Sequence, residues 1–233
     1  MKVTLISDTH TQHARVGKDL PGGDLLIHAG DFMASGYNPM EAMLFFKWFD
    51  EIDNYDTKVF IAGNHDRYMQ DYPTEAKYLL DKHSTISYLE DNMLSKYVNE
   101  TTDVKIYGTP WQPEFYNWAF NLPRNGSELQ SKWDAIPDNT DILVTHGPAY
   151  GFLDDVEGRR GQHLGCELLT ERIKAFKPKI HVCGHIHTGH GHYFDGHTHF
   201  FNAALLDERY RYTQSAWNFE WNPISNEIEW LTI

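Results

Sequence analysis

Residues 2–10 read KVTLISDTH, a short apolar and β-branched run that is followed at once by Asp8-Thr9-His10. The run over residues 2–7 predicts a buried β-strand, because such residues favour an enclosed, pleated position. Asp8 and His10 are two residues apart, so on an extended chain both side chains point to the same side. A carboxylate and an imidazole placed in this way can bind one metal ion. In isolation, a D-x-H tripeptide is more often just a polar strand end.

Four more strand-like runs end in the same manner, over residues 25–29, 58–62, 142–145 and 180–183. Each ends within a residue or two of a polar cluster. The clusters are Gly30-Asp31, Gly63-Asn64-His65-Asp66, Thr145-His146-Gly147-Pro148 and Gly184-His185-Ile186-His187. In open α/β sheets, ligands bind just beyond the carboxyl ends of the strands. The recurrence indicates one site that is assembled from five strand ends.

The clusters from the first half of the chain carry several possible roles. Asp31 follows Gly30, and its carboxylate can bridge two metal ions or cap a short helix. Asn64 offers a neutral carbonyl oxygen. His65 is a candidate acid or hydrogen-bond donor to a phosphate, because imidazole titrates near neutrality. Asp66 can orient its neighbours or cap the next segment.

The clusters from the second half are rich in histidine. His185 and His187 alternate in G-H-I-H, so both can face one pocket, with Ile186 pointing into the core. The full candidate set offers oxygen and nitrogen ligands and no thiol: Asp8, His10, Asp31, Asn64, His146, His185 and His187. This set predicts two divalent metal ions side by side, and metal-assisted hydrolysis of a phosphate ester. Mn²⁺ is expected first, with Fe, Zn, Co or Ni as alternatives.

The bulk composition narrows the class of substrate. At 233 residues, the chain fits one domain over residues 1–233. The net charge of -13 argues against binding long DNA or RNA, which needs a basic surface. The pair Arg159-Arg160 is too small a basic patch to change this. A small phosphorylated substrate remains compatible with the acidic balance, because bound divalent ions make a pocket locally positive.

The two cysteines and the lack of a long apolar run indicate in which cellular compartment the protein is expected. Cys166 and Cys183 could form one disulfide, but buried or idle thiols in a reducing compartment are the expected interpretation. The chemistry begins at residue 8, which leaves no room for a signal peptide. No apolar run approaches the ~20 residues of a membrane helix. We therefore expect a cytoplasmic protein without membrane association.

The rest of the chain predicts a mixed α/β sandwich. Helical patterns cover residues 40–49, 73–81, 127–133 and 164–176, and strand-like stretches cover residues 86–89, 96–98 and 104–107. The tail over residues 193–233 is expected to be a meander of strands, with turns at Asp195-Gly196 and Asn222-Pro223. The loop over residues 109–124 (TPWQPEFYNWAFNLPR) is rich in aromatic residues and too long for a plain turn.

The five clusters, in this order, resemble the signature of the calcineurin-like metallophosphoesterases. The resemblance implies a four-layer α-β-β-α sandwich of two mixed sheets, with a dimetal site at the carboxyl ends of the strands. It also implies that one metal is held by Asp8, His10 and His187, and the other by Asn64, His146 and His185. Asp31 would then bridge the two metals. His65 corresponds to the family's histidine beside the scissile phosphate.

Further segments resemble the metallophosphoesterase domain-containing branch of this family. They are residues 106–111 (IYGTPW), 117–122 (NWAFNL), 145–151 (THGPAYG) and 201–203 (FNA). The resemblance implies nucleotide binding and hydrolysis of cyclic-nucleotide phosphodiesters, and the presence of His187 favours a competent catalyst. One departure is Ala34, which stands where many members have the aspartate that pairs with the histidine equivalent to His65.

These observations predict hydrolysis of a nucleotide phosphodiester, cyclic or linear, by a metal-bridging hydroxide that attacks in line. His65 and Asp31 are the expected catalytic residues, and His65 and Asn64 the expected substrate-binding residues. Two alternatives are a 5′-nucleotidase acting on nucleoside monophosphates and a metal-dependent nucleotide-binding module with little turnover. The loop residues Trp111, Phe115, Tyr116 and Trp118 either stack a nucleobase or form a packed lid.

Overall fold

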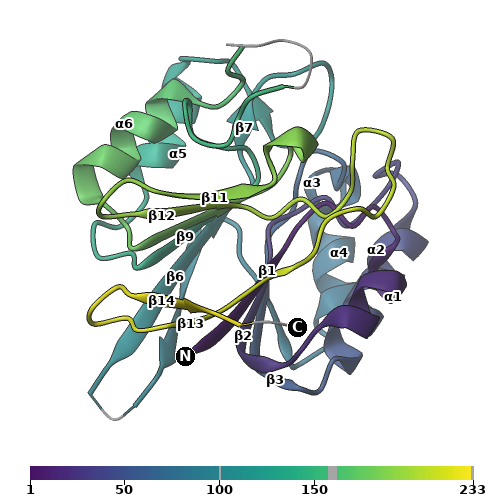
Figure 1. Cartoon of the computed structure of the whole chain (residues 1–233). Coiled ribbons are helices and arrows are strands. Elements are labelled where there is room, and N and C mark those ends of the chain that lie inside the picture. The colour runs from purple at the N-terminus through teal and green to yellow at the C-terminus, as the bar shows by residue number, and fades with distance from the viewer. Residues whose placement is uncertain (100, 157–161, 232–233) are drawn as a thin grey trace.

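The protein is a layered sandwich of two β-sheets between two layers of helices (Figure 1). The computed structural model describes residues 1–99, 101–156 and 162–231, so Arg159-Arg160 lie outside the described residues. The helices on one side are α1 (His13–Val16), α2 (Pro39–Glu51) and α4 (Pro73–Leu80), and those on the other are α5 (Ser127–Asp134) and α6 (Glu167–Phe176). The short helix α3 (Arg67–Asp71) precedes α4. The predicted four-layer α-β-β-α architecture is confirmed.

The first sheet joins strands from both ends of the chain. Its order is β14 (Ile228–Trp230), β13 (Trp217–Trp221), β1 (Lys2–Ile6), β2 (Gly23–His28), β3 (Tyr55–Phe60) and β4 (Ile86–Tyr88). Strands β1 to β4 pair in parallel, while β13 is antiparallel to β1. The carboxyl ends of β1, β2 and β3 therefore share one edge.

The second sheet has a parallel centre between antiparallel edges. Its order is β11 (Gly191–Phe194), β12 (His199–Asn202), β10 (Ile180–Cys183), β9 (Ile142–Thr145), β6 (Asp103–Thr109) and β5 (Asn92–Tyr97). Strands β9, β10 and β12 run in parallel with β6, whereas β5 and β11 are antiparallel to their neighbours. Two short strands, β7 (Gln112–Pro113) and β8 (Asn121–Leu122), pair within the aromatic loop.

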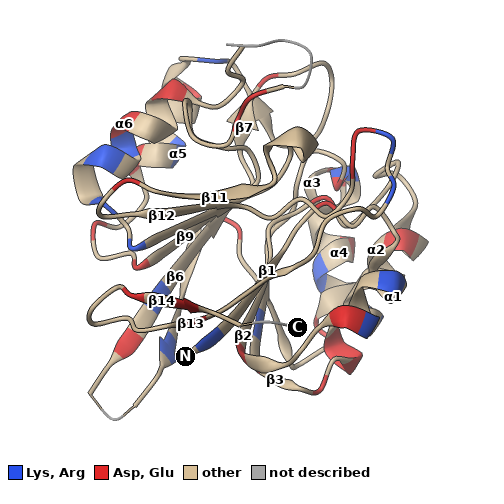
Figure 2. Cartoon of the chain, viewed as in Figure 1, with Lys and Arg blue, Asp and Glu red and all other residues tan. Residues whose placement is uncertain are grey.

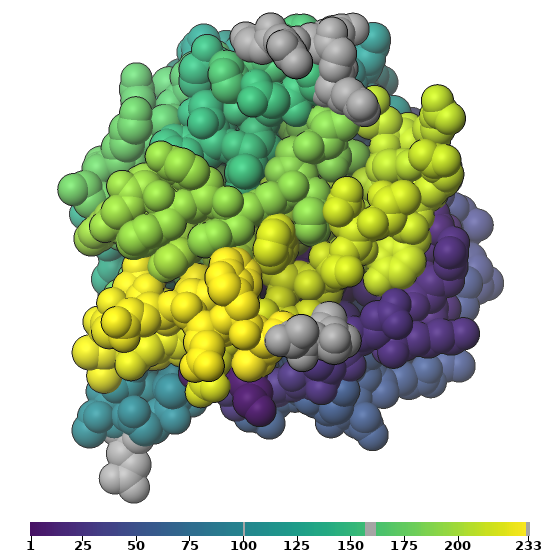
Figure 3. All heavy atoms as spheres, in the orientation of Figure 1, coloured from purple at the N-terminus to yellow at the C-terminus, as the bar shows by residue number. Residues whose placement is uncertain are grey.

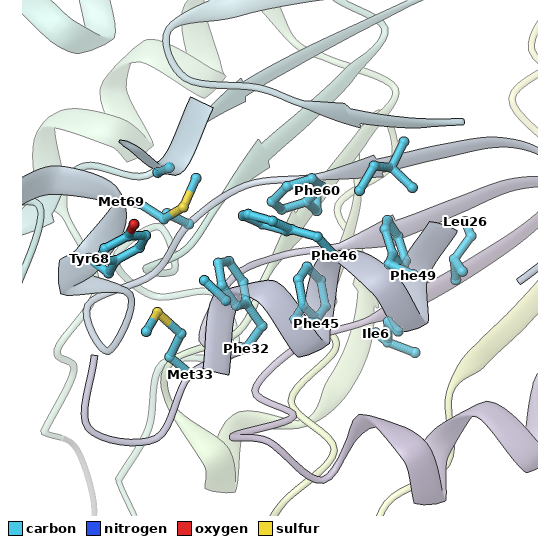
Figure 4. Packing of buried hydrophobic residues seen from close by; sticks show 14 of the residues in the cluster. Ile6, Leu26, Phe32, Met33, Phe45, Phe46, Phe49, Phe60, Tyr68 and Met69 are labelled. Atoms are coloured by element: carbon cyan, nitrogen blue, oxygen red, sulfur yellow. The ribbon is translucent and has the colours of Figure 1, made fainter. Parts of the chain in front are cut away.

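Three buried clusters fill the spaces between the four layers. In β1, Leu5 faces the second sheet and Ile6 faces the helices, because successive side chains point to opposite faces. Behind the first sheet, α2 presents Phe45, Phe46 and Phe49 to the sheet (Figure 4). Each fully buried phenylalanine contributes about 1.5–3 kcal/mol through removal of apolar surface from water. These strands are thus enclosed on both faces, which positions their carboxyl ends rigidly.

Helix α6 and the chain before it correct one expectation. The helical pattern from residue 164 predicts an earlier start, but the helix begins at Glu167. The backbone N–H of Leu164 donates to the Asp154 carbonyl, and that of Cys166 donates to the Pro148 carbonyl. Pairing with neighbouring loops therefore takes these residues out of the helix. The short helices α1 and α3 were not predicted either.

The C-terminal tail forms the predicted antiparallel pairs around Asp195-Gly196 (β11 with β12) and Asn222-Pro223 (β13 with β14), but the meander is interrupted between them. Residues 203–216 form no strand, and they cross from the second sheet to the first beside the N-terminal residues (Figure 3). Two side-chain hydrogen bonds join the segments: Gln12 Nε2 donates to the Tyr210 carbonyl at 2.7 Å, and the Tyr212 hydroxyl donates to Asp19 at 3.2 Å. The crossing carries Asp207 and Tyr210 towards the ends of the strands.

Two further expectations concern the cysteines and the membrane. Cys166 and Cys183 are both buried and free, as expected for idle thiols. Within the described part of the chain, none of the helices combines the length and the apolar character needed to span a bilayer.

Candidate metal centre

The predicted ligands come together just beyond the carboxyl ends of β1, β2, β3, β9 and β10. The backbone there is not extended, which corrects the expected alternation in D-x-H and H-x-H. Asp8, His10, Asp31 and His185 all have positive φ angles, of 54°, 37°, 57° and 67°. Such angles are uncommon outside glycine and concentrate at functional sites. The side chains converge because the chain turns sharply after each strand.

Glycines in the clusters let the backbone approach the carboxylates. A Cβ at Gly184 would overlap the Asp8 carboxylate, and a Cβ at Gly63 would overlap that of Asp31. The space is used by hydrogen bonds from the backbone. His185 N–H donates to Asp8 Oδ2 at 3.1 Å, and His65 N–H donates to Asp31 Oδ1 at 2.7 Å. Any side chain at either glycine would displace a carboxylate.

Asp31 stands between two groups of imidazoles. Its Oδ2 lies 3.7 Å from His10 Nε2 and 3.3 Å from His146 Nε2, while Oδ1 is held by His65 N–H. On the His10 side, Asp8 Oδ1 lies 4.0 Å from His10 Nε2 and 3.3 Å from His187 Nε2. Asp8, His10 and His187 form one compact group of potential ligand atoms, and Asp8, Asp31 and His146 form another.

The remaining candidates lie on the His146 side. Asn64 Oδ1 is 3.0 Å from His146 Nε2, and the His185 ring centroid is 5.2 Å from that of His146. His65 joins His10 and Asp31 in a third compact group. The structure thus brings all of the predicted ligands, together with His65, to one end of the sandwich.

Backbone carbonyls orient three of the histidines. The Nδ1 atoms of His10, His146 and His187 lie 2.9–3.0 Å from the carbonyl oxygens of Met33, Ala29 and Asp207. A carbonyl can only accept, so each Nδ1 carries the hydrogen and each neutral ring turns the lone pair of Nε2 towards oxygen ligands. His10 Nε2 is buried and has no hydrogen-bond partner among the described residues. Lone pairs that face one another fit a bound cation.

Neighbouring carboxylates raise the pKa values of His146 and His187. Burial lowers the pKa of His146, but the Asp31 carboxylate outweighs it and raises the pKa to about 9. Burial likewise lowers the pKa of His187, and its contact with Asp8 raises it to about 9. Carboxylates this close favour a positive charge on the rings. Divalent cations would take the place of those protons.

Asp66 organises the turn that carries Asp31. Its buried carboxylate accepts hydrogen bonds from the N–H groups of Asp31, Met33 and Gly63, at 2.7–2.8 Å. It makes no side-chain capping bond to α3, so of the two predicted roles the structure bears out the orienting one. Burial and the nearby Asp31 carboxylate raise its pKa well above the usual range.

His65 has a neutral partner in place of a carboxylate. Its Nδ1 lies 2.6 Å from the backbone carbonyl of Ala34, so this ring also carries its hydrogen on Nδ1. The Trp118 ring lies 4.2 Å away and the His10 ring 4.6 Å away, measured between centroids. The residue that departs from the family pattern thus still orients His65, through its main chain.

A cavity of about 470 Å³ lies over the ligands, and Asp31, Asn64, His65, His185 and His187 form part of its wall. From the aromatic loop, Phe115 and Trp118 line the cavity. Trp111 instead donates from Nε1 to Asp91 and packs edge-on against Phe120. Tyr116 is exposed and is not among the lining residues. Trp111 is thus packed within the fold, as the lid interpretation expects, while stacking of a nucleobase on Phe115 and Trp118 stays a prediction.

The sequence patterns did not identify several residues of the site. Tyr210 lines the cavity with its ring centroid 4.9 Å from that of His10 and 5.6 Å from that of His187. Asp207 orients His187 through its carbonyl, and Gln112 lines the cavity beside Gly147. Tyr210 and Asp207 belong to the crossing segment, which carries no motif. Gln112 stands inside the aromatic loop, but nothing in the pattern gives it a role.

The calcineurin-like phosphoesterase family description matches residues 1–189. The chain belongs to the calcineurin-like phosphoesterase family. It is 40% identical over 222 residues to metallophosphoesterase domain-containing protein 1 of Homo sapiens, a match that covers 88% of this chain and 66% of that protein. It is 37% identical to the UPF0046 protein T07D4.2 of Caenorhabditis elegans, covering 89% of this chain and 57% of that protein. The chain thus spans less than two thirds of the length of these relatives.

Among solved structures, TT1561 of Thermus thermophilus has a TM-score of 0.65 and 15% identity, and the match covers 98% of this chain and 96% of that one. This likeness shows a shared fold. The expected resemblance to the metallophosphoesterase domain-containing branch is confirmed by the human relative. Membership of the family supports a dinuclear site for divalent metals and a metal-dependent phosphoric ester hydrolase.

Proposed function

We propose that this protein hydrolyses phosphodiesters of nucleotides, cyclic or linear, with the help of two divalent metal ions. The observation that carries the proposal is the position of Asp31 Oδ2, which lies within 3.7 Å of His10 Nε2 and 3.3 Å of His146 Nε2. The other oxygen, Oδ1, is occupied by the His65 N–H group. One free carboxylate oxygen between two imidazoles is what a bridging ligand requires.

The proposed ligands are divided between two ions. Asp8, His10 and His187 hold one, Asn64, His146 and His185 hold the other, and Asp31 is shared. Mn²⁺ is the proposed metal, since oxygen and imidazole ligands without thiolate suit it. When bound, two such ions activate water and neutralise charge on the phosphoryl oxygens.

The chain's own groups position the substrate. His65 lines the cavity with its Nδ1–H committed to the Ala34 carbonyl, so it donates to the phosphate or the leaving oxygen from Nε2 when that nitrogen also carries a proton. Asn64 also lines the cavity and supplies a second polar contact. The Ala34 carbonyl orients His65 in place of a carboxylate, which supports turnover over a binding module without turnover.

A nucleotide is the proposed substrate on the basis of the cavity. A volume of about 470 Å³ is within the range of sites for small ligands, about 300–1,000 Å³. Phe115 and Trp118 provide apolar ring faces on the wall, which suit a nucleobase. In the view of Figure 2, Lys and Arg residues are scattered over several helices and strands rather than gathered along one face. This distribution supports a small substrate over a long nucleic acid.

The test is a panel of nucleotide phosphodiesters and 5′-monophosphates, assayed after chelation and after addition of Mn²⁺, Zn²⁺, Co²⁺ or Ni²⁺. We expect many turnovers on a diester, loss of activity on chelation, and recovery with Mn²⁺. Metal analysis should find two ions per chain. Tight nucleotide binding without product would overturn the proposal, and preferential turnover of monophosphates would redirect it to a 5′-nucleotidase.

A further inference from the structure

One side-chain acceptor in the wall of the cavity has no partner among the described residues. Gln112 is 2% exposed, and its Oε1 is buried without a hydrogen-bond partner among the residues that the structure describes. Buried polar atoms are almost always paired, because an unpaired acceptor loses its hydration without compensation. Gln112 nevertheless lines the cavity over the metal centre. Its oxygen therefore calls for a donor that the described chain does not supply.

The orientation of this amide follows from its neighbour. Asn121 Nδ2 donates to the carbonyl oxygens of Phe115 and Tyr116, at 3.0 and 3.1 Å. Asn121 Oδ1 must then be the acceptor on the other side, and Gln112 Nε2 donates to it at 3.3 Å. A flipped Gln112 amide would set two oxygens against each other. The oxygen of Gln112 is thus directed away from Asn121.

Gly147 marks the space beside this oxygen. A Cβ built on Gly147 would lie 3.3 Å from Gln112 Cβ and 3.4 Å from Oε1. Both residues line the cavity that Phe115 and Trp118 also line. Gly147 therefore places no side chain against the buried acceptor, and a Cβ there would lie in contact with it. Asn121, which fixes the orientation of the Gln112 amide, also donates to the carbonyls of Phe115 and Tyr116. Hydrogen bonds therefore connect the acceptor to the aromatic wall of the cavity.

We propose that Gln112 Oε1 selects the base of the substrate by accepting a hydrogen bond from an exocyclic amino group of a nucleobase that lies against Phe115 and Trp118. This inference rests on the proposed function. With the phosphate at the metal ligands and the base face on the aromatic rings, the base presents its edge to the wall. Ring nitrogens of adenine accept hydrogen bonds, so the amino group is the donor that its edge can offer. Adenine-type nucleotides are then preferred over analogues without the amino group.

The test compares adenosine 3′,5′-cyclic monophosphate with the purine riboside analogue, which lacks the amino group, on the Mn²⁺-loaded enzyme. The adenine compound can donate a hydrogen bond to the buried Oε1, whereas the analogue leaves this acceptor unpaired. We therefore expect kcat/KM to be about 10- to 100-fold higher for the adenine compound. In Gln112→Met the ratio should fall to about one. Gln130→Met, the same substitution on α5, is the matched control and should keep the wild-type ratio. Thermal melting establishes that each variant is folded.

Two outcomes overturn the inference. Equal kcat/KM for the two compounds in the wild type would mean that the partner of Oε1 is water. An equal loss for both compounds in Gln112→Met would mean that the residue only supports the loop, and Asn121→Ala should then reproduce that loss. Hydrolysis of bis(p-nitrophenyl) phosphate, which has no base, tests the proposed function separately. Activity on that diester without discrimination between the nucleotides defeats the inference and leaves phosphodiester hydrolysis standing.

Discussion

The two sheets supply different atoms to the candidate metal centre. The ends of β1, β2 and β3 in the first sheet bring Asp8, Asp31 and Asn64, while the ends of β9 and β10 in the second bring His146, His185 and His187. His10 is the exception, an imidazole from the first sheet. Among the candidate ligands, the two closest contacts between carboxylate and imidazole, Asp31 with His146 and Asp8 with His187, each join one sheet to the other. The ligand set is therefore completed only when the sheets pack together.

In both sheets, a buried histidine forms a hydrogen bond with a threonine hydroxyl behind the site. In the first, buried His28 lies with Nε2 2.9 Å from the Thr9 hydroxyl, between Asp8 and His10 in sequence. In the second, buried His181 lies with Nε2 2.9 Å from the Thr145 hydroxyl, next to His146. The Thr145 hydroxyl donates to the Gly147 carbonyl, so it accepts from His181. A hydrogen bond from a neutral histidine of a neighbouring strand thus holds the threonine at the end of β1 and of β9.

The largest effect is expected from the ligand that the two halves share. Asp31→Asn keeps the shape but removes the charge from the oxygen between His10 and His146. We expect a loss in kcat/KM beyond the about 10²–10³-fold of a single lost donor, together with loss of metal. Metal analysis and turnover of a diester measure both. Asp138→Asn, at an exposed carboxylate, is the control; full activity and metal content in Asp31→Asn would disprove the shared ligand.

The packing between the sheets is tested next. Phe201 of the second sheet stacks on Phe219 of the first, with ring centroids 4.9 Å apart. Phe201→Ala should lower the free energy of unfolding by about 3–5 kcal/mol. Phe45→Ala, behind the first sheet, should cost a similar amount. Urea unfolding measures both.

Only Phe201 lies between the two sheets whose strand ends carry the candidate ligands; Phe45 lies between the first sheet and its helices. We expect weaker Mn²⁺ binding in Phe201→Ala, by titration at a temperature where both variants are folded, and unchanged binding in Phe45→Ala. Equal weakening in the two variants would show that general loss of stability, and not the packing between sheets, controls the centre.

Substitution of His65 tests catalysis independently of metal binding. His65→Asn removes the imidazole beside the ligands but leaves the backbone N–H that holds Asp31 Oδ1. We expect a decrease of about 10²–10³-fold in kcat with two metal ions retained. Steady-state kinetics and metal analysis of the same preparation provide the measurement. Loss of a metal ion would instead place His65 among the ligands, as its group with His10 and Asp31 allows.

The smallest effect is expected on the pH dependence of stability, from the buried histidines His28 and His181. Burial lowers the pKa of His28 and of His181 to about 3 in the folded protein, against 6.5 in the unfolded chain. Below pH 6.5 the unfolded state binds protons that the folded state does not. Stability from each residue is therefore complete above pH 6.5 and falls as the pH decreases towards 3.

Between pH 7 and pH 5, each histidine should remove about 1–2 kcal/mol from the free energy of unfolding. Urea unfolding at several pH values should show a shallower slope in His181→Gln than in the wild type. His197→Gln, on an exposed turn, serves as the control. An unchanged slope in His181→Gln would mean that His181 can be protonated within the fold.

Much of the site could be predicted because its signals are local. A strand, a tight turn and a polar residue are adjacent in sequence, so the five clusters were identifiable, and strands β9 and β10 match residues 142–145 and 180–183. The convergence of Asp8 with His10 and of His185 with His187 was predicted correctly. The extended backbone assumed for it was wrong, because positive φ at Asp8 and His185 depends on hydrogen bonds from distant residues. The cytoplasmic location and the single domain over residues 1–233 stay predictions.

What the sequence determined by itself is the inventory of candidate ligands and their order along five strand ends. The tertiary structure alone decided which oxygen of Asp31 is free, that the Ala34 carbonyl replaces an acidic partner of His65, and that Tyr210 and Gln112 join the cavity wall. Strand propensity and cluster chemistry depend on neighbours in sequence. The contacts that orient these groups join residues far apart in the chain, so they exist only after the two sheets have packed.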